Sequence, residues 1–448
     1  MLSDIHFDPF HDPGKTARLV AAPISEWGEI LAEPPSADQV WSFAALQQRC
    51  GARGVDTPYA LLQSSLQTAH RAAPNAAFAT VSGDLIAHGF ACRFAAAFPG
   101  RAQDDYTAFV EKTVEYVTTE LRNTFPGVPV YVALGNNDSN CGDNRIDQGS
   151  EFLAAVAKSV MAGWPKSMDP ADRKKAMADF AAGGYYSVMM AAPMRNTRLI
   201  VLDDVFMSTV YATCGGKPDN AAAAAQITWL RKELDGARQR RERVWVMGHI
   251  PPGVDIYSTF SKIRNLCGGD APVMFLSSDE LGKVLTENSD VVRLGIFAHT
   301  HMDELRLLEP ESGAKGGPVA IKLIASISPV NGNHPSFTVA QVDTAAAMLR
   351  DYTVFAASNP VGNGAWSKEY DYAQKYHAAA FSPAALKKLI GDFQGDPNAT
   401  TQASRAYIGN FVVGDNSSLI KPLWPQYVCG LSHATAKGFV RCMCPTMP

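Results

Sequence analysis

The chain has 448 residues, of which 46% are hydrophobic, with a formal net charge of −4 and a pI near 6.2. This length predicts one large folded domain with an appended region. The acidic balance disfavours nucleic acid as an obligate partner. No run of about 18 apolar residues is present, so we expect no transmembrane segment in the chain as given, and no signal-peptide pattern opens it.

Strand-like and helix-like segments alternate through the first three hundred residues. Residues 1–3 form the tail of a predicted strand, which is short against a typical ~5–6 residues; we therefore expect residues upstream of Met1, such as a removed signal peptide. Short β-rich runs then lie at 77–81, 128–134, 199–202, 244–247 and 291–297. Helical patterns cover 58–72, 104–125 and 221–242. Buried strands separated by helices predict an α/β sandwich.

The pattern changes after residue 301. We expect the runs at 305–308, 319–324, 337–342 and 348–355 to be consecutive strands of a second sheet. From about residue 366 onward we predict helical segments and then a cysteine-bearing tail.

Eight cysteines are present, and none forms a Cys-x-x-Cys pair, which disfavours a zinc ribbon or a thioredoxin-like site. Three of them, Cys429, Cys442 and Cys444, lie in the last twenty residues, where disulfides would stabilise a tail with little core of its own. The even count is typical of an oxidising compartment. Buried free thiols in a cytosolic enzyme are the alternative, and the spacing leaves the connectivity open.

Five short motifs each follow an apolar run, and five of the ten histidines fall within them. Any one motif alone has an ordinary explanation, such as a chance occurrence at the protein surface, a turn or a buried core histidine. Together they predict a dinuclear metal site. The motifs are Asp4-Ile5-His6, Gly83-Asp84-Leu85-Ile86-Ala87-His88, Gly135-Asn136-Asn137-Asp138, Gly248-His249 and His299-Thr300-His301.

Two metal ions ~3.5–4 Å apart activate a shared water or hydroxide for attack on phosphorus, and they need one bridging carboxylate. Asp84 is the natural bridge. Asp4 and His6 suit one ion, Asn136 and His249 suit the second, and His299 and His301 divide between the two. Imidazole, carboxylate and amide ligands serve Zn, Mn or Fe alike.

The same residues resemble the calcineurin-type metallophosphoesterase superfamily and, within it, the acid sphingomyelinase-like phosphodiesterases. The narrower resemblance covers roughly residues 1–390, with no separate saposin-like module. It rests on Ser3-Asp4-Ile5-His6-Phe7-Asp8-Pro9, Asp56-Thr57-Pro58-Tyr59, Gly248-His249-Ile250-Pro251-Pro252-Gly253, His299-Thr300-His301-Met302-Asp303-Glu304 and Asn333-His334-Pro335-Ser336-Phe337.

The resemblance implies a four-layer α/β/β/α sandwich of two mixed β-sheets flanked by helices, with a C-terminal helical, cysteine-bearing region. It implies a catalytic domain over residues 1–360 and a helical extension packed on it over 361–448. It also implies two zinc ions, a periplasmic or secreted location, and hydrolysis of phosphodiester or phosphoanhydride bonds. One ion would be held by Asp4, His6, Asp84 and His301, and the other by Asp84, Asn136, His249 and His299.

Two positions depart from the family pattern. Ala298 replaces a glycine, with little chemical consequence. Asn137 stands where the family carries a histidine that protonates the leaving group, and an amide cannot donate that proton, although it can hydrogen-bond a phosphate oxygen. We therefore assign the general-acid role to His88, four residues after Asp84; general acid help is worth about 10²–10⁴-fold.

Several substrate classes stay open. Nucleotides, CDP-alcohols and phosphocholine-type lipids are the leading candidates for a phosphodiesterase. Polyphosphate or a phosphomonoester is the alternative, because Gly-Asn-Asn-Asp also resembles the endopolyphosphatase motif, and a non-catalytic metal-binding relative is less favoured. A lipid substrate would require an exposed apolar rim, for which the candidates are Trp27, Trp41, Phe43, Tyr257 and Phe260.

Overall fold

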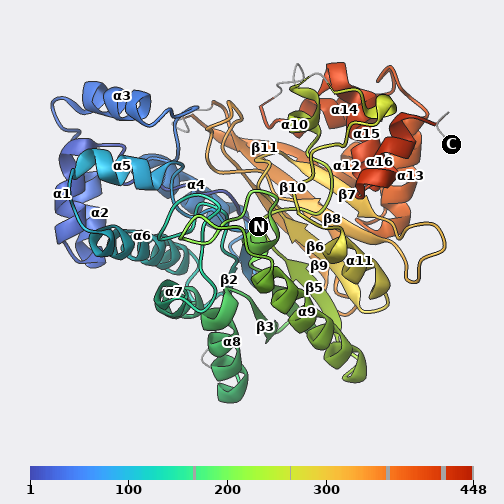
Figure 1. The fold of residues 1–448 in the computed structure, drawn as a ribbon, viewed down its shortest axis with the longest axis horizontal. Helices are drawn as coiled ribbons and strands as arrows, with labels where there is room; N and C mark the ends of the chain where they lie inside the picture. Colours follow the sequence, from blue (N-terminus) through green and yellow to red (C-terminus); the bar gives the residue numbers. More distant parts are fainter. Residues whose placement is uncertain (165–167, 263, 360–363, 415–419, 446–448) are drawn as a thin grey trace.

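A computed structural model of the chain describes residues 1–164, 168–262, 264–359, 364–414 and 420–445. The predicted domain boundary between residues 360 and 361 lies outside these residues. Two β-sheets form the centre of the molecule and helices cover the outside (Figure 1).

One sheet has six strands in the order β3-β4-β5-β6-β8-β7. The four central strands run parallel, and β3 and β7 pair antiparallel at the two edges, so the sheet is mixed. The strands are β3 (Tyr186–Met189), β4 (Thr197–Val201), β5 (Arg243–Met247), β6 (Val292–Phe297), β7 (Glu304–Leu308) and β8 (Val319–Leu323).

The start of the chain joins the remaining strands into the second sheet. Leu2 forms a parallel bridge to Val81 of β1, and on its other side Met1 exchanges two backbone hydrogen bonds with Thr338 of β9, at 2.8 and 3.0 Å. The order is therefore β2-β1-residues 1–2-β9-β10-β11. The strands are β1 (Ala79–Val81), β2 (Val130–Val132), β9 (Ser336–Asp343), β10 (Met348–Ala357) and β11 (Trp366–Asp371).

The expectation of one sheet after residue 301 is wrong. β8 pairs parallel with β6, and β7 folds back on β8, so both join the six-stranded sheet, whereas β9 and β10 pair beside the start of the chain. Period-2 alternation identifies a strand but not its partner. Residues 366–371 also differ from the helical prediction, because β11 pairs antiparallel with β10; helices begin at Tyr372.

The two sheets pack face to face. The Trp245 ring of β5 lies 5.8 Å from the Phe78 ring, and its Nε1 donates to the carbonyl of Ala347, between β9 and β10, at 2.7 Å. α4 and α6 cover one outer face, and α9 and α13 cover the other. The fold is thus the predicted four-layer α/β/β/α sandwich.

Helices account for most of the rest of the described chain, and those expected over 58–72, 104–125 and 221–242 are present as α4, α6 and α9. In the first half lie α1 (Pro13–Ala21), α2 (Trp27–Ala32), α3 (Gln39–Arg49), α4 (Tyr59–Ala72), α5 (Phe90–Ala97), α6 (Gln103–Thr124), α7 (Glu151–Met161) and α8 (Pro170–Gly183). In the second lie α9 (Ala221–Gln239), α10 (Ile256–Phe260), α11 (Glu280–Glu287), α12 (Tyr372–Tyr376), α13 (Pro383–Gln394), α14 (Gln402–Phe411), α15 (Trp424–Ser432) and α16 (Ala436–Met443).

All eight cysteines form disulfides, which confirms the expectation from their even number. Two of the four bonds hold the C-terminal region: one lies within the tail and one ties it to the segment before α11. The disulfides are Cys50–Cys92, Cys141–Cys214, Cys267–Cys444 and Cys429–Cys442.

Among the described residues, no helix combines the length and the apolar character needed to cross a bilayer.

Candidate metal centre

The five motifs converge at one end of the two sheets. Asp84 follows β1 and Asn136 follows β2, while His249 follows β5 and His299 follows β6. The carboxyl ends of parallel strands are where open α/β sheets place their sites. Asp84, Asn136, His299 and His301 line a cavity of about 610 Å³, and Asp4, His6 and His249 are buried.

Five of the seven predicted ligands have a left-handed backbone, a conformation that non-glycine residues rarely adopt. Such a turn after a strand aims the side chain away from the sheet and toward the other proposed ligands. Strain of this kind persists where the surrounding structure enforces it, and it clusters at functional sites. The φ angles are 44° at Asp4, 44° at His6, 55° at Asp84, 72° at His299 and 66° at His301.

Two glycines allow the ligand loops to approach one another. Gly83 has a φ of 92°, and a Cβ there would lie 2.9 Å from His249 Nδ1 and 2.8 Å from the amide nitrogen of Gly135. A Cβ at Gly135 would overlap the carboxylate of Asp84. Any larger residue at either position would therefore displace Asp84 or His249.

The first cluster joins Asp4, His6, Asp84 and His301. His6 Nε2 lies 3.3 Å from His301 Nε2 and 3.3 Å from Asp84 Oδ2. Asp4 Oδ1 lies 3.5 Å from His301 Nε2 and 3.9 Å from His6 Nε2.

The second cluster joins Asp84, Asn136, His249 and His299. His249 Nε2 lies 3.2 Å from Asp84 Oδ2 and 3.0 Å from Asn136 Oδ1. His299 Nδ1 lies 2.8 Å from Asn136 Oδ1 and 3.3 Å from His249 Nε2. Asp84 Oδ2 is thus common to both clusters.

Hydrogen bonds on the far side of two rings fix their orientation. His6 Nδ1 lies 2.9 Å from the carbonyl oxygen of Ile86, and His249 Nδ1 lies 2.8 Å from that of Ser82. A carbonyl only accepts, so both Nδ1 atoms carry hydrogen, and in the neutral form of each ring Nε2 presents a lone pair to the other ligands. This arrangement is typical of metal-binding histidines.

The chemistry of these groups fits cations. Both carboxylate oxygens of Asp4 and Nδ1 of His301 are buried without a hydrogen-bond partner. Burial raises the pKa of Asp4 to about 7 and lowers the pKa of His299 to about 3. Burial alone would raise the pKa of Asp84, but His249 and His6 hold it well below its usual range. Burial would lower the pKa of His249 too, but Asp84 outweighs this and raises it to about 10, so in the absence of an ion this imidazolium supplies positive charge beside the carboxylates. A bound cation would take over that role.

Two buried carboxylates brace the ligand loops from behind. Asp138 accepts from the backbone N–H groups of Leu85 at 2.7 Å and Gly135 at 2.9 Å. Asp204 accepts from the N–H groups of His249 and Ile250, each at 3.0 Å. The loops that carry Asp84 and His249 are therefore fixed before any ligand binds.

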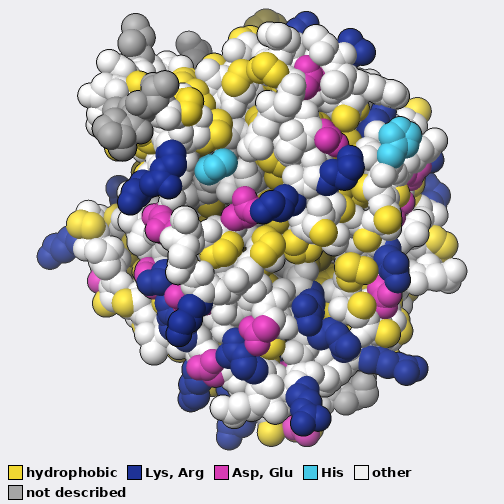
Figure 2. Space-filling view, turned by 90° about the vertical axis from the view of Figure 1, so that its right-hand side faces the viewer, with side chains coloured by type: hydrophobic (Ala, Val, Ile, Leu, Met, Phe, Trp, Pro, Cys, Tyr) yellow, Lys and Arg dark blue, Asp and Glu magenta, His cyan; other side chains and the backbone are white. Residues whose placement is uncertain are grey.

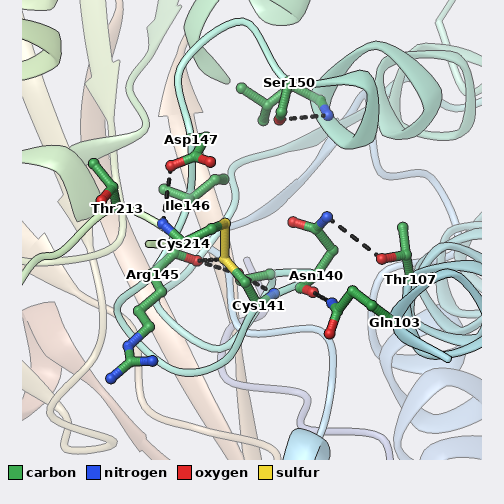
Figure 3. The surroundings of a disulfide bond; sticks show 12 residues. Gln103, Thr107, Asn140, Cys141, Arg145, Ile146, Asp147, Ser150, Thr213 and Cys214 are labelled. Atoms are coloured by element: carbon green, nitrogen blue, oxygen red, sulfur yellow. Dashed lines mark hydrogen bonds between the residues drawn. A yellow bond between two sulfur atoms is a disulfide. The ribbon is translucent and has the colours of Figure 1, made fainter. Parts of the chain in front are cut away.

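Asp143 orients the amide of Asn136. Asn136 Nδ2 donates to Asp143 Oδ1 at 2.6 Å, which leaves Oδ1 facing the imidazoles. The loop that carries Asp143 is held by the Cys141–Cys214 disulfide, and Cys214 N–H donates to Asp147 at 2.9 Å (Figure 3).

His88 lies beside the first cluster. Its ring stacks on the His6 ring at 3.8 Å, and its Nδ1 lies 2.8 Å from Asp56 Oδ1. Burial would lower the pKa of His88, but Asp56 outweighs this and raises it. Arg93 and Ser328 hold the Asp56 carboxylate in turn, at 3.3 and 3.0 Å.

Asn137 faces the shared carboxylate. Its backbone N–H donates to Asp84 Oδ1 at 2.8 Å and its Nδ2 donates to Oδ2 at 2.9 Å.

Asp56, Asp138, Asp143 and Asp204 were not predicted as supporting residues. Asp56 and Asp138 lie within motifs that carry the family resemblance, and no other sequence pattern marks them. Among the aromatic candidates for an exposed rim, the predictions for Trp27 and Phe43 are wrong: both are buried, and Trp27 donates to the carbonyl of Leu19 at 2.9 Å. Trp41 and Tyr257 are exposed, and Phe260 is half-buried.

Comparison with known proteins gives one family and a consistent group of relatives. The family model for calcineurin-like phosphoesterase matches residues 2–303. Acid sphingomyelinase-like phosphodiesterase 3b of Mus musculus is 24% identical, covering 99% of this chain and 89% of its own. Cyclic GMP-AMP phosphodiesterase SMPDL3A of Rattus norvegicus is 26% identical over 75% of this chain and 70% of its own. A dimetal phosphatase structure from Danio rerio is 13% identical, with a TM-score of 0.38, covering 66% of this chain and 84% of that one.

Proposed function

Because the chain belongs to the calcineurin-like phosphoesterase family, we propose that it is a dinuclear metal-dependent phosphodiesterase. The observation that carries this proposal is the position of Asp84 Oδ2, which lies 3.3 Å from His6 Nε2 in one cluster and 3.2 Å from His249 Nε2 in the other. A bridging carboxylate between two sets of nitrogen and oxygen donors is what a two-metal phosphoesterase needs.

In this proposal Asp4, His6, Asp84 and His301 hold one divalent ion, and Asp84, Asn136, His249 and His299 hold the other. When bound, such a pair supplies an activated water nucleophile and charge to neutralise the phosphorus oxygens. Zinc is the leading candidate because four of the seven ligands are imidazoles; Mn or Fe is the alternative.

His88 is the proposed general acid. Its Nδ1 is engaged by Asp56, so Nε2 is the nitrogen from which a proton would pass to the leaving oxygen. The Asp56 carboxylate favours the protonated ring, which is the form a general acid needs at the start of the reaction.

Asn137 takes a different role from the histidine that the family carries there. Its two hydrogen bonds to Asp84 hold the bridging carboxylate in one orientation. The remaining amide hydrogen can meet a phosphate oxygen, but the amide cannot protonate a leaving group.

The proposed substrates are nucleotides, CDP-alcohols or phosphocholine-type lipids. The relatives' names, which include sphingomyelinase and cyclic GMP-AMP phosphodiesterases, support a phosphodiester as the substrate.

A polyphosphatase or phosphomonoesterase is the second candidate function. Among the described residues that line the metal cavity, the only Lys or Arg side chains are Arg53 and Arg93, and Arg93 is paired with Asp8 and Asp56. This sparse positive charge disfavours a long polyanion.

We also infer a catalytic domain over residues 1–360 with the helical extension over 361–448 packed on it, and a periplasmic or secreted location. Four disulfides support that location, since cytosolic thiols are kept reduced.

A substrate panel tests the proposal. Metal-replete protein is incubated with ATP, CDP-choline, sphingomyelin and polyphosphate at acidic and neutral pH, and phosphate and headgroup release are measured. Turnover of a diester is expected. Stoichiometric metal without turnover of any phosphoester would favour a non-catalytic relative instead.

A further inference from the structure

Two cavities meet beside the metal centre. The metal cavity of about 610 Å³ adjoins a second cavity of about 540 Å³. The residues that line both cavities, which we call the junction, are Arg53, Asp255, Ser258, Phe275, His299 and Asn331. Because His299 is a proposed ligand of the second metal ion, the junction begins at the metal centre. A substrate whose phosphate binds the metals would reach the second cavity through it.

Arg53 is the unpaired positive charge of the junction. Among the described residues that line either cavity, the only Lys or Arg side chains are Arg53, Arg93 and Arg306. Arg93 is held by two buried carboxylates, and Arg306 is held by the carboxylate of Glu304 at 2.9 Å. Arg53 is exposed and forms no hydrogen bond or ion pair with any described residue. It is therefore free to bind an anionic ligand.

Exposure alone would not single out Arg53. Lys and Arg side chains are common at protein surfaces, and they are scattered over much of the face shown in Figure 2. Arg49 is also exposed and has no partner among the described residues, but it lines neither of the two cavities. The position of Arg53 at the junction is what distinguishes it.

The loop that carries Arg53 is anchored on both sides. The Cys50–Cys92 disulfide ties its beginning to α5. At its end, Gly54 lies so close to Val330 that a Cβ on Gly54 would be 2.3 Å from the Val330 carbonyl oxygen. The backbone that carries the arginine is thus fixed before a substrate binds, which lowers the entropic cost of binding.

We propose that Arg53 is a specificity-determining residue that binds a second phosphate of the substrate, next to the phosphate held at the metal centre. This inference rests on the proposed phosphodiesterase function and names the substrate class as diphosphate diesters. Two metal ions neutralise the phosphate that they bind, but a neighbouring phosphate at the junction needs a cation of its own. A guanidinium suits it, because its planar N–H donors match phosphate oxygens in pairs.

The charge at the junction distinguishes between the candidate substrates. One unpaired arginine matches one further phosphate rather than a long polyphosphate chain. A phosphocholine headgroup would instead place a quaternary ammonium beside Arg53, and like charges repel. Asp255 is the opposite charge at the junction, but its Oδ1 already accepts from the Ser258 N–H at 2.9 Å, as the N-cap of α10. The diphosphate is therefore favoured.

Calorimetric titration of the metal-loaded protein tests the proposal. The probes are AMP and the non-hydrolysable α,β-methylene-ADP, which differ by one phosphate. We expect wild type to bind the diphosphate analogue about 10- to 100-fold more tightly than AMP. In Arg53→Gln this ratio should fall close to one, and Arg53→Lys should restore part of it. Arg49→Gln is the matched control and should behave as wild type. The metal content and Tm of each variant show that folded, metal-loaded proteins are compared.

Three outcomes would overturn the proposal: no preference of wild type for the diphosphate analogue, an equal affinity ratio in wild type and Arg53→Gln, or the same loss of affinity for both probes. The third would place Arg53 on the metal-held phosphate. Tighter binding of phosphocholine than of inorganic phosphate, lost in Asp255→Asn, would assign the junction to a cation instead. Arg53-dependent binding of the analogue without turnover of any phosphoester would refute the proposed function and leave the phosphate site standing, so the two failures are distinguishable.

Discussion

Asp56 holds His88 through both of its carboxylate oxygens. Oδ2 accepts from the His88 backbone N–H at 2.9 Å, and Oδ1 lies 2.8 Å from the ring Nδ1. Asp56 therefore fixes the orientation of the His88 ring and keeps a hydrogen on its Nδ1. Arg93 anchors the Asp56 carboxylate in turn. We propose that this pairing enables His88 to protonate the leaving group, which the amide of Asn137 cannot do.

Replacing His88 with alanine tests the acid directly. We expect turnover of an alkyl phosphodiester to fall by about 10²–10⁴-fold, with a much smaller loss on bis-p-nitrophenyl phosphate, because p-nitrophenolate departs without protonation. Steady-state kcat on the two substrates is the measurement. Full turnover of the alkyl diester by the variant would show that another group donates the proton.

Asp56→Asn should reproduce the same leaving-group dependence more weakly. The amide keeps the size of the carboxylate but not the charge that favours protonated His88. We expect kcat on the alkyl diester to fall with KM little changed. A general loss of folding would lower kcat on both substrates equally, and that result would reduce Asp56 to a structural role.

Metal removal should destabilise the fold. Asp4 is buried with both carboxylate oxygens unpartnered, so chelation leaves uncompensated buried groups. Ligand bound only by the folded state stabilises it by about 2.7 kcal/mol at a concentration about 100 times its Kd. Thermal unfolding with and without a chelator measures the effect, and Asp84→Asn should abolish most of the difference. An unchanged Tm after verified metal removal would contradict this.

Asp396 should stabilise the C-terminal region in a pH-dependent way. Burial alone would raise its pKa, but the backbone N–H groups of Thr400 and Thr401, each donating at 2.8 Å, lower it well below the usual range. A folded-state pKa below the unfolded value gives stability that is present above the unfolded pKa, about 3.9, and lost as pH falls through the folded pKa.

The Tm difference between wild type and Asp396→Asn should therefore be largest near neutral pH and shrink below about pH 4. Asp392→Asn, at an exposed position on α13 that pairs only with Lys388 in the described structure, is the matched control and should show little difference at any pH. A constant difference between wild type and Asp396→Asn across the range would count against the carboxylate as the cause.

The convergence of the proposed ligands could be predicted because most of them follow strand-like runs, and strand ends can be recognised from local patterns. The sequence did not predict which strands share a sheet. All four of β7, β8, β9 and β10 follow one another in the sequence, yet only β7 and β8 join the six-stranded sheet, since pairing depends on contacts distant in sequence. For the same reason the link from Asp56 to His88, 32 residues apart, was not visible.

Exposure was equally hard to read from the sequence. Trp27 and Trp41 lie on consecutive helices, α2 and α3, but Trp27 packs on Phe109 and Tyr116 whereas Trp41 is exposed. Helical periodicity identifies an apolar side without saying what covers it.

We propose that Asp84 bridges two metal ions held by separate clusters. Metal content per chain can be measured by elemental analysis on wild type and on His249→Ala. We expect about two ions in wild type and about one in His249→Ala, with turnover of bis-p-nitrophenyl phosphate lost in the variant. One ion in wild type, or two retained in His249→Ala with full turnover, would contradict it.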